Sequence, residues 1–171
     1  MSPRQKEPLT YEHALLGFLL QTPMHAYALH HTLMYSPLGS VWRVKQSALY
    51  AMLTRLADEG LLDAGEEDIA ARGKRVFTVT PTGETAFMEW CVTPVPHPRD
   101  MRMEFLAKLY FLEQLPPHFH QKLIRAQQFQ AQQWYEPLDD TLSRYAQRVR
   151  QFRNGQITAI QAWLSMLDEK E

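Results

Sequence analysis

The sequence has 171 residues but only one cysteine, Cys91, so the chain cannot form an internal disulfide. This shortage points to a reducing compartment, and we expect a cytoplasmic protein. The sequence also contains no apolar run near the roughly 18 residues that a membrane span requires. Residues 1–8 are polar and lack the apolar core of a signal peptide. We therefore expect no membrane partner.

An excess of one charge is missing too. The 18 lysines and arginines nearly balance the 19 aspartates and glutamates, and the formal net charge is −1. This balance excludes a chain that is basic throughout, although it still allows a local cationic surface. Hydrophobic residues make up 45% and charged residues 22% of the chain, which is typical of a globular protein and excludes a disordered one.

Motifs for catalysis and metal binding are absent as well. The sequence has no phosphate-binding glycine loop, nucleophile elbow or metalloprotease motif. Its seven histidines lack cysteine or carboxylate partners at ligand spacing, so we expect no metal and no cofactor. Cys91 has no cation beside it in the sequence, which favours an inert thiol over a redox sensor. No catalytic residue can be named, and we expect that the chain is not an enzyme.

What the sequence does contain is an uneven distribution of charge. Residues 13–57 carry no aspartate or glutamate, whereas residues 63–68 are rich in both. The cations near these segments form two groups, which are Arg43, Lys45 and Arg55 in the first and Arg72, Lys74 and Arg75 in the second. Short basic runs are usually solvated surface. These groups gain meaning only if the fold brings them to one face.

Hydrophobic periodicity predicts three short helices in the first sixty residues, at Leu9–Leu20, Ala26–Tyr35 and Lys45–Glu59. Gly60 follows the third helix and is typical of a helix end. The residues expected to face the core from the third helix are Leu49, Met52, Leu53 and Leu56. Those expected on its outer side are Gln46, Ser47, Tyr50 and Thr54.

Two short strands, Leu61–Gly65 and Arg75–Thr80, are expected next, joined by a connection that is long for a hairpin. Pro81 then suits the first turn of a fourth helix. Three short helices, a hairpin and a returning helix describe a winged helix-turn-helix. We therefore predict a mainly α-helical chain with a small β-hairpin, whose winged helix-turn-helix domain covers residues 9–92.

The second part of the chain is expected to be entirely helical. Three prolines make residues 93–100 an extended junction. A helix at Met101–Leu115 should be followed by a longer helical stretch, interrupted at Pro137 and again at Asn154–Gly155. Residues 101–171 then form an all-α region, for which we predict roles in dimerisation and effector binding.

An apolar residue recurs every seven positions along this stretch, with a second set offset by four, as in a coiled coil. Helices of the same chain are one way to cover so long a seam. A second subunit is the interpretation that we favour, because residues 101–171 offer few elements to cover both stripes. The residues predicted to form this homodimer interface are Ile124, Ala131, Tyr135, Leu138, Leu142, Tyr145, Val149, Phe152 and Leu164.

In a helix-turn-helix, the second helix of the pair lies in the DNA major groove. Gln46 and Ser47, near the start of that helix, suit hydrogen bonds to base edges. The neighbouring cations and hydroxyls suit phosphates, and the hairpin cations suit the backbone or the minor groove. The candidate DNA-binding residues are Arg43, Lys45, Gln46, Ser47, Tyr50, Thr54, Arg55, Arg72, Lys74 and Arg75. The alternative is a winged helix that binds protein and no DNA.

Five short motifs follow one another along the first half of the chain. Ala14–Gly17, Pro23–Tyr27, Ser47–Tyr50, Glu59–Leu61 and Arg75–Gly83 together resemble the PadR family of transcriptional regulators. The resemblance implies a winged-helix DNA-binding domain followed by a helical dimerisation region. Such a protein is usually a repressor whose affinity for DNA falls when a small molecule binds, and phenolic compounds are among the effectors of the family. Tyr27 matches a motif tyrosine, which implies either a phosphate contact or a core contact.

Aromatic residues of the C-terminal region could line an effector pocket, although interface core is the interpretation that we favour for them. They are Phe105, Tyr110, Phe129 and Trp134. Together these inferences predict a homodimeric, cytoplasmic repressor that binds double-stranded operator DNA. A small aromatic or phenolic effector would release it by changing the relative orientation of the two DNA-binding domains.

Overall fold

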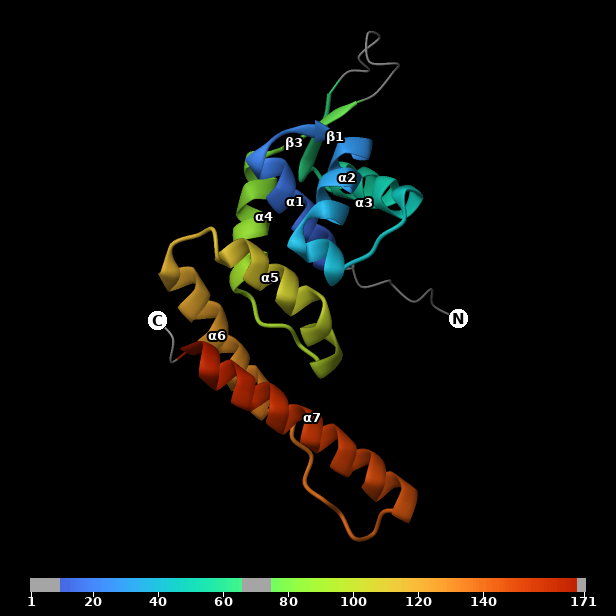
Figure 1. Cartoon of the computed structure of the whole chain (residues 1–171), viewed down its shortest axis with the longest axis vertical. Helices are drawn as coiled ribbons and strands as arrows, with labels where there is room; N and C mark the ends of the chain where they lie inside the picture. The colour runs from blue at the N-terminus through green and yellow to red at the C-terminus, as the bar shows by residue number, and fades with distance from the viewer. Residues whose placement is uncertain (1–9, 66–74, 169–171) are drawn as a thin grey trace.

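The computed structural model of the chain describes residues 10–65 and 75–168. Figure 1 shows a group of short helices and a small sheet at one end of the molecule, and two longer helices that extend away from them. Helices dominate, and the three strands form a single antiparallel sheet. The predicted fold class is therefore confirmed. Within the described ranges, no helix combines the length and the apolar character needed to cross a membrane.

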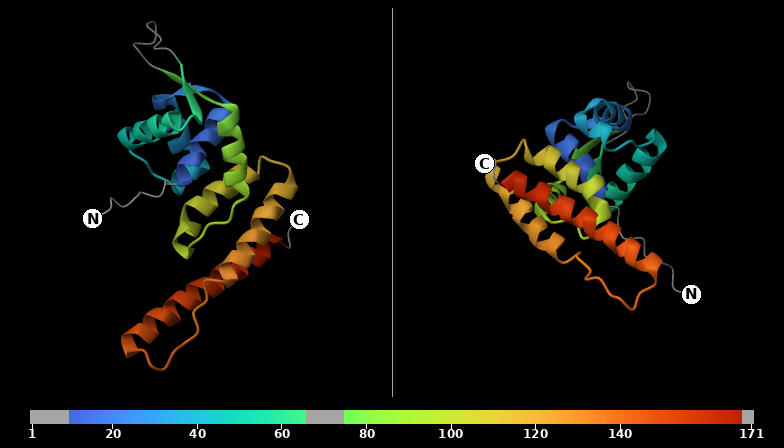
Figure 2. Two further views of the ribbon diagram at one scale, coloured as in Figure 1. Left: turned by 180° about the vertical axis from the view of Figure 1, so that it is seen from behind. Right: turned by 60° about the horizontal axis from the view of Figure 1, so that its bottom comes forward.

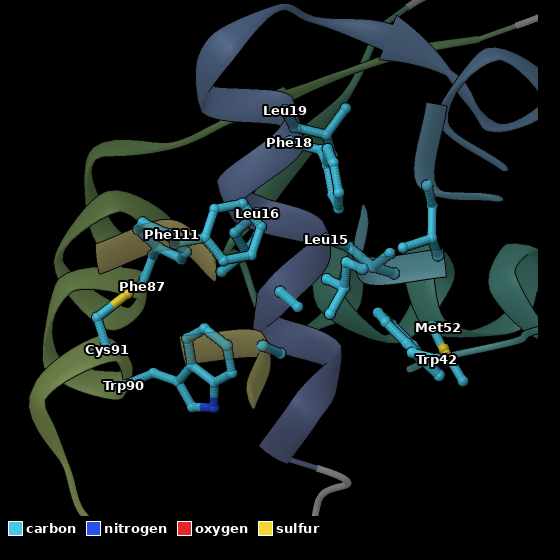
Figure 3. Packing of buried hydrophobic residues seen from close by; sticks show 14 of the residues in the cluster. Leu15, Leu16, Phe18, Leu19, Trp42, Met52, Phe87, Trp90, Cys91 and Phe111 are labelled. Atoms are coloured by element: carbon cyan, nitrogen blue, oxygen red, sulfur yellow. The ribbon is translucent and has the colours of Figure 1, made fainter. Parts of the chain in front are cut away.

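The helix at the centre of the first group is α1 (His13–Gln21), which follows a 3₁₀ turn at Thr10–Glu12. Residues 14–19 of α1 are all buried, because later parts of the chain pack around this helix. Figure 3 shows Phe87, Trp90 and Phe111 on one side of α1, with Trp42 and Met52 on another. One continuous apolar core thus runs through the group.

The helix-turn-helix pair consists of α2 (Ala26–Tyr35) and α3 (Gln46–Asp58), joined through a 3₁₀ turn at Pro37–Ser40. The predicted range of α2 is confirmed, and α3 is one residue shorter than predicted at each end. Gly60 has a φ of 73° just beyond α3, where a side chain would be strained. The predicted inner face of α3 is buried, comprising Leu49, Met52, Leu53 and Leu56.

The two predicted strands are present as β2 (Leu62–Ala64) and β3 (Val76–Val79), which pair antiparallel. A third strand, β1 (Met24–His25), pairs with the other edge of β3 and gives the order β1-β3-β2. β1 was not predicted from the sequence, because two residues before a helix show no alternation. The sheet ties the start of α2 to the hairpin that follows α3.

Helix α4 (Pro81–Val92) returns along α1 and completes the winged helix-turn-helix. Its predicted start is confirmed, because the Thr80 hydroxyl accepts a hydrogen bond from the Gly83 amide at 3.0 Å. A Cβ atom on Gly83 would lie 2.1 Å from the Leu61 carbonyl oxygen. This position therefore needs glycine so that α4 can approach the strand closely.

Three helices follow, α5 (Glu104–Leu112), α6 (Pro117–Gln132) and α7 (Arg144–Asp168). The helix predicted over 101–115 is divided, because Met103 leaves helical geometry, with a φ of −131°, between α5 and a 3₁₀ turn at Pro98–Arg102. The predicted junction packs against α6. Its Val95 is buried, and the Gln127 side chain bonds both the amide and the carbonyl of that residue, at 2.7 and 3.1 Å.

Helices α6 and α7 pack side by side and antiparallel (Figure 2). The chain reverses through residues 133–143, which include Pro137, as expected for a helix interrupted there. The predicted break at Asn154–Gly155 is wrong, because α7 runs through it. Asn154 is buried, and its side chain bonds the backbone of Glu136, which offsets the low helix propensity of the pair.

This reversal changes how the predicted dimer residues are placed. Ile124, Ala131 and Leu164 are fully buried inside the chain, so they are corrected from interface to intrachain core. Leu142 and Val149 are half-buried. The remaining four stay exposed at the far end of α7 and the loop before it, and they are Tyr135, Leu138, Tyr145 and Phe152.

Candidate nucleic-acid interface

The outer face of α3 presents a polar surface. Lys45 immediately precedes the helix, and no side chain caps its N-terminus, so its first amides remain open to a partner. The inner face is anchored by leucines in the core, which holds the outer face rigidly. The candidate DNA contacts exposed on this surface include Arg43, Lys45, Gln46, Ser47, Tyr50 and Thr54. Their proposed contacts with DNA stay predictions.

Two hydrogen bonds fix how α2 supports this surface. His30 Nε2 lies 2.9 Å from the Val44 carbonyl oxygen, which holds the chain just before α3. At the other end of α2, His25 Nδ1 accepts a hydrogen bond from the Ala28 amide at 3.0 Å and caps the helix. Tyr27 follows this cap and is exposed, so the structure favours a surface position over the core position that the family motif also allowed.

Arg55 occupies a different setting from the other candidates. Its guanidinium donates two hydrogen bonds to the Glu12 carboxylate, and Glu12 is only 5% exposed. This hydrogen-bonded pair raises the pKa of Arg55. The charge predicted for a phosphate is thus engaged within the chain and joins α3 to the start of α1. Glu12 was missed by the sequence analysis, because the two residues share no local pattern.

The hairpin cations are only partly described. Arg75 is exposed immediately before β3. Arg72 and Lys74 lie outside the described residues. Figure 1 places α2, α3 and the start of β3 at one end of the molecule, opposite the exposed end of α7.

A cavity of about 900 Å³ lies in the C-terminal region, between the 3₁₀ turn at Pro98–Arg102, the 133–136 segment and α7. Its apolar lining includes Met101, Leu106, Trp134, Ile157, Ile160 and Trp163. Its charged lining consists of Arg99, Arg102, Arg153 and Glu136. Trp134 is fixed at the rim, because its indole Nε1 donates to the Pro96 carbonyl oxygen at 2.8 Å.

Of the four residues predicted for an effector pocket, only Trp134 lines this cavity. Phe105 is fully buried, with its ring 5.8 Å from that of Trp163. Tyr110 packs on Phe18 in the core, and Phe129 is exposed on α6. The other three are therefore corrected, because they lie in the core or on the surface. The lining arginines were missed, since they are spread over two segments more than fifty residues apart.

The remaining candidates for chemistry are the Cys91 thiol and the side chains that could bind a metal. Burial raises the pKa of the Cys91 thiol to about 12, which agrees with an inert thiol. Across the two described ranges, no group of three histidine, cysteine, aspartate or glutamate side chains is arranged to hold a metal ion.

Solved structures that the chain resembles over most of its length include Bacillus subtilis PadR in complex with operator DNA. That match has 21% identity and a TM-score of 0.44, and it covers 94% of this chain and 98% of the other. Bacillus subtilis PadR in complex with p-coumaric acid matches at 22% identity and a TM-score of 0.45. That match covers 95% of this chain and 96% of the other. The Vibrio cholerae virulence activator AphA matches at 20% identity and a TM-score of 0.43. That match covers 93% of this chain and 94% of the other.

The sequence of the first half of the chain is similar to that of a known family. The family model described as "Transcriptional regulator PadR-like family" matches residues 15–89. The "Negative transcriptional regulator PadR" of Bacillus subtilis (strain 168) is 28% identical over 102 residues. That alignment covers 59% of this chain and 56% of the relative, so the chain spans little more than half of the relative's length. The family model covers every candidate DNA contact named above.

Proposed function

Because residues 15–89 of this chain match the PadR-like family of transcriptional regulators, we propose that it is a member of that family and a sequence-specific DNA-binding protein that reads its operator with α3. One observation carries the proposal, namely the exposed polar face at the start of a helix whose other face is locked into the core. Gln46 and Ser47 face base edges, and Lys45 faces a phosphate. Residues 13–57 contain no carboxylate that would repel the DNA.

The experiment is a gel shift with DNA fragments from upstream of the protein's own coding region, repeated at several salt concentrations. Affinity should fall steeply with salt, because bound phosphates release counterions. Lys45→Ala should weaken binding to all fragments and reduce the slope of log K against log salt by about 0.9 for each bound subunit. Gln46→Ala should keep that slope but reduce the preference for the operator by about 1–3 kcal/mol.

Lys122→Ala is the matched control, since it removes an exposed lysine on α6, far from α3. It should bind like the unchanged protein. Binding that ignores salt, or that Lys45→Ala and Lys122→Ala alter equally, would contradict the proposal and favour a winged helix that binds protein.

The protein acts as a homodimer in this proposal. Tyr145 and Phe152 lie one heptad apart on α7 and are 79% and 68% exposed, and Tyr135 and Leu138 add to the same end of the molecule. Exposed apolar residues gathered in this way are typical of a protein–protein contact. A second copy of the chain would cover them and present two α3 helices to one duplex. As a DNA-binding protein, it would act in the cytoplasm, where the DNA is.

The proposal extends to repression relieved by a small aromatic effector. The curated relative is named a negative regulator, and the cavity offers a site of suitable chemistry. Trp134 and Trp163 suit an aromatic ring, and the arginines that line the cavity suit its carboxylate. Isothermal titration calorimetry with p-coumaric acid tests this, with Arg102→Met expected to weaken binding and exposed Lys122→Met as the control. Equal binding by both variants would place the effector elsewhere.

A further inference from the structure

Helix α5 carries a buried ion pair that the proposed function does not yet use. Glu104 and Lys108 lie one turn apart, and Lys108 Nζ is 2.9 Å from Glu104 Oε1. The Lys108 side chain is only 1% exposed. Charges are rarely buried to this extent in proteins, so a specific arrangement is needed to hold them.

The groups around the pair come from the winged helix and the residue just after it. Trp90 of α4 donates from its indole Nε1 to Glu104 Oε1 at 3.1 Å. Lys108 Nζ lies 5.2 Å from the centre of the same indole and donates to the Thr93 carbonyl oxygen at 2.7 Å. His13 of α1 stacks on Trp90, with the two ring centres 6.3 Å apart and the ring planes tilted by 15°. We call Trp90, Glu104 and Lys108 the α4–α5 joint.

The electrostatics of the joint favour a geometric role over a stabilising one. Burial lowers the pKa of Lys108, and the adjacent Glu104 carboxylate opposes that change. Taking both charges out of water costs much of what their attraction returns, so apolar residues often replace such pairs without loss of stability. The hydrogen bonds of the joint are directional, however, whereas apolar contacts are not. Among the described residues, no buried side-chain nitrogen or oxygen lacks a partner, so each buried polar side-chain atom of the joint has at least one.

The position of the joint determines what its geometry controls. α5 is the first full helix after the winged helix, and both α4 and α5 pack against α1. The exposed end of α7 lies at the far end of the molecule from α3 (Figure 1). A small change in the angle between α4 and α5 would therefore move α3 over a long lever relative to the dimer contact.

We propose that Glu104 and Lys108 are positioning residues that fix the angle between α4 and α5 and thereby set the distance between the two α3 helices of a dimer. This inference rests on the proposed function, because it requires two subunits on one operator. The distance between recognition helices must match the spacing of the two DNA half-sites. The joint thus selects among operators by spacing, while α3 selects by sequence.

The first test measures affinity for a series of DNA duplexes with two half-sites and spacers that differ by single base pairs. The unchanged protein should prefer one spacer at least about tenfold, about 1.4 kcal/mol, over spacers two base pairs away. The apolar variant Glu104→Leu/Lys108→Met should keep its affinity for a single half-site and lose this preference to within about threefold. An unchanged spacer profile in the variant would overturn the proposal.

The second test needs no DNA. A spin label on the exposed Ala51 of α3, introduced as Ala51→Cys in a Cys91→Ser background, reports one distance across the dimer by pulsed electron paramagnetic resonance. A single narrow distance is expected in the parent and a broadened or displaced one in the Glu104→Leu/Lys108→Met variant. An identical distribution in both would overturn the proposal, as would a change of the same size in the Lys122→Met control.

Further controls separate a loss of folding, and a failure of the proposed function, from the specific effect of the joint. Circular dichroism and urea unfolding establish that the variant folds. If it does not, Glu104→Gln/Lys108→Met replaces it, since the amide oxygen still accepts from Trp90. Absence of DNA binding, or of any dipolar signal, in the parent protein would refute the proposed function itself. A normal parent with an unaltered variant would refute the joint alone.

Discussion

The guanidinium of Arg55 lies against the buried carboxylate of Glu12, 43 positions earlier in the chain. The contact joins the outer side of α3 to the turn that precedes α1. Half of the Arg55 side chain remains exposed, whereas the carboxylate is almost fully enclosed. The pair is therefore unequal, because loss of the arginine leaves a buried charge, while loss of the glutamate leaves a solvated one.

We expect Arg55→Met to lower the free energy of unfolding by about 1–3 kcal/mol, since Glu12 would keep a buried and unpaired carboxylate. Glu12→Gln should cost less, because the amide still accepts a hydrogen bond. Urea unfolding of both single variants and the double variant measures the coupling. Additive effects in this cycle would show that the two groups do not interact in solution.

Two glycine-to-alanine substitutions should change stability in opposite directions. Gly83→Ala places a Cβ 2.1 Å from the Leu61 carbonyl oxygen, so α4 must shift, at a cost of about 1–3 kcal/mol. Gly155→Ala meets nothing within 4 Å inside α7 and should stabilise the protein by about 0.5–1 kcal/mol. Thermal unfolding compares the two. A gain at position 83 would contradict the close approach of α4 to the strand.

The buried thiol of Cys91 should make stability fall at alkaline pH. Burial raises its pKa from the ordinary value of 9.0 to about 12, so the unfolded chain loses this proton at lower pH than the folded chain does. Stability is therefore lost as the pH rises above about 9, with a slope near 1.4 kcal/mol per pH unit from this group. Urea unfolding at about pH 8 and pH 10.5 measures it.

Cys91→Ala provides the comparison for that measurement. The substitution lowers stability at neutral pH, because it removes buried volume. The alkaline decline, however, should be shallower in the variant than in the parent. Parallel curves would show that the thiol does not titrate with a raised pKa.

Charge at the exposed end of α7 should disrupt self-association. Phe152→Glu places a carboxylate at the centre of the proposed dimer contact and should shift the protein to monomer, with little change in its own unfolding. Light scattering after size-exclusion chromatography measures the mass. Arg148→Glu, an exposed charge reversal on the same helix, separates a general effect of charge from the loss of an apolar contact. A parent protein that is already monomeric would contradict the dimer.

Local patterns allowed much of the first half of the fold to be predicted. The 3.6-residue spacing of leucines located α3 and its inner face, and Gly60 located the end of that helix. β1 escaped because its two residues are ordered by pairing with β3, a contact between positions about fifty residues apart. Glu12 escaped for the same reason, since its role depends on a partner that only the fold brings near.

The second half shows where periodicity misleads. A seven-residue repeat runs through residues 124–152, but the chain reverses within it, so the repeat describes no continuous face. Burial then divides its members between the core and the surface. Similarly, Phe105 and Phe129 are aromatic, but only the packing of α5 and α6 decides that one is enclosed and the other solvated. The cavity depends on three segments meeting, which no single stretch of sequence encodes.

Phe111 of α5 fills a space that belongs to the winged helix. Its ring centre lies 5.3 Å from those of Phe18 and Phe87 (Figure 3). Its edge lies so close to Gly17 that no larger residue fits there. A fragment cut after α4 would open this aromatic pocket to water. The winged helix-turn-helix therefore cannot be separated from α5. A chimaera that joins it to another oligomerisation domain must include α5.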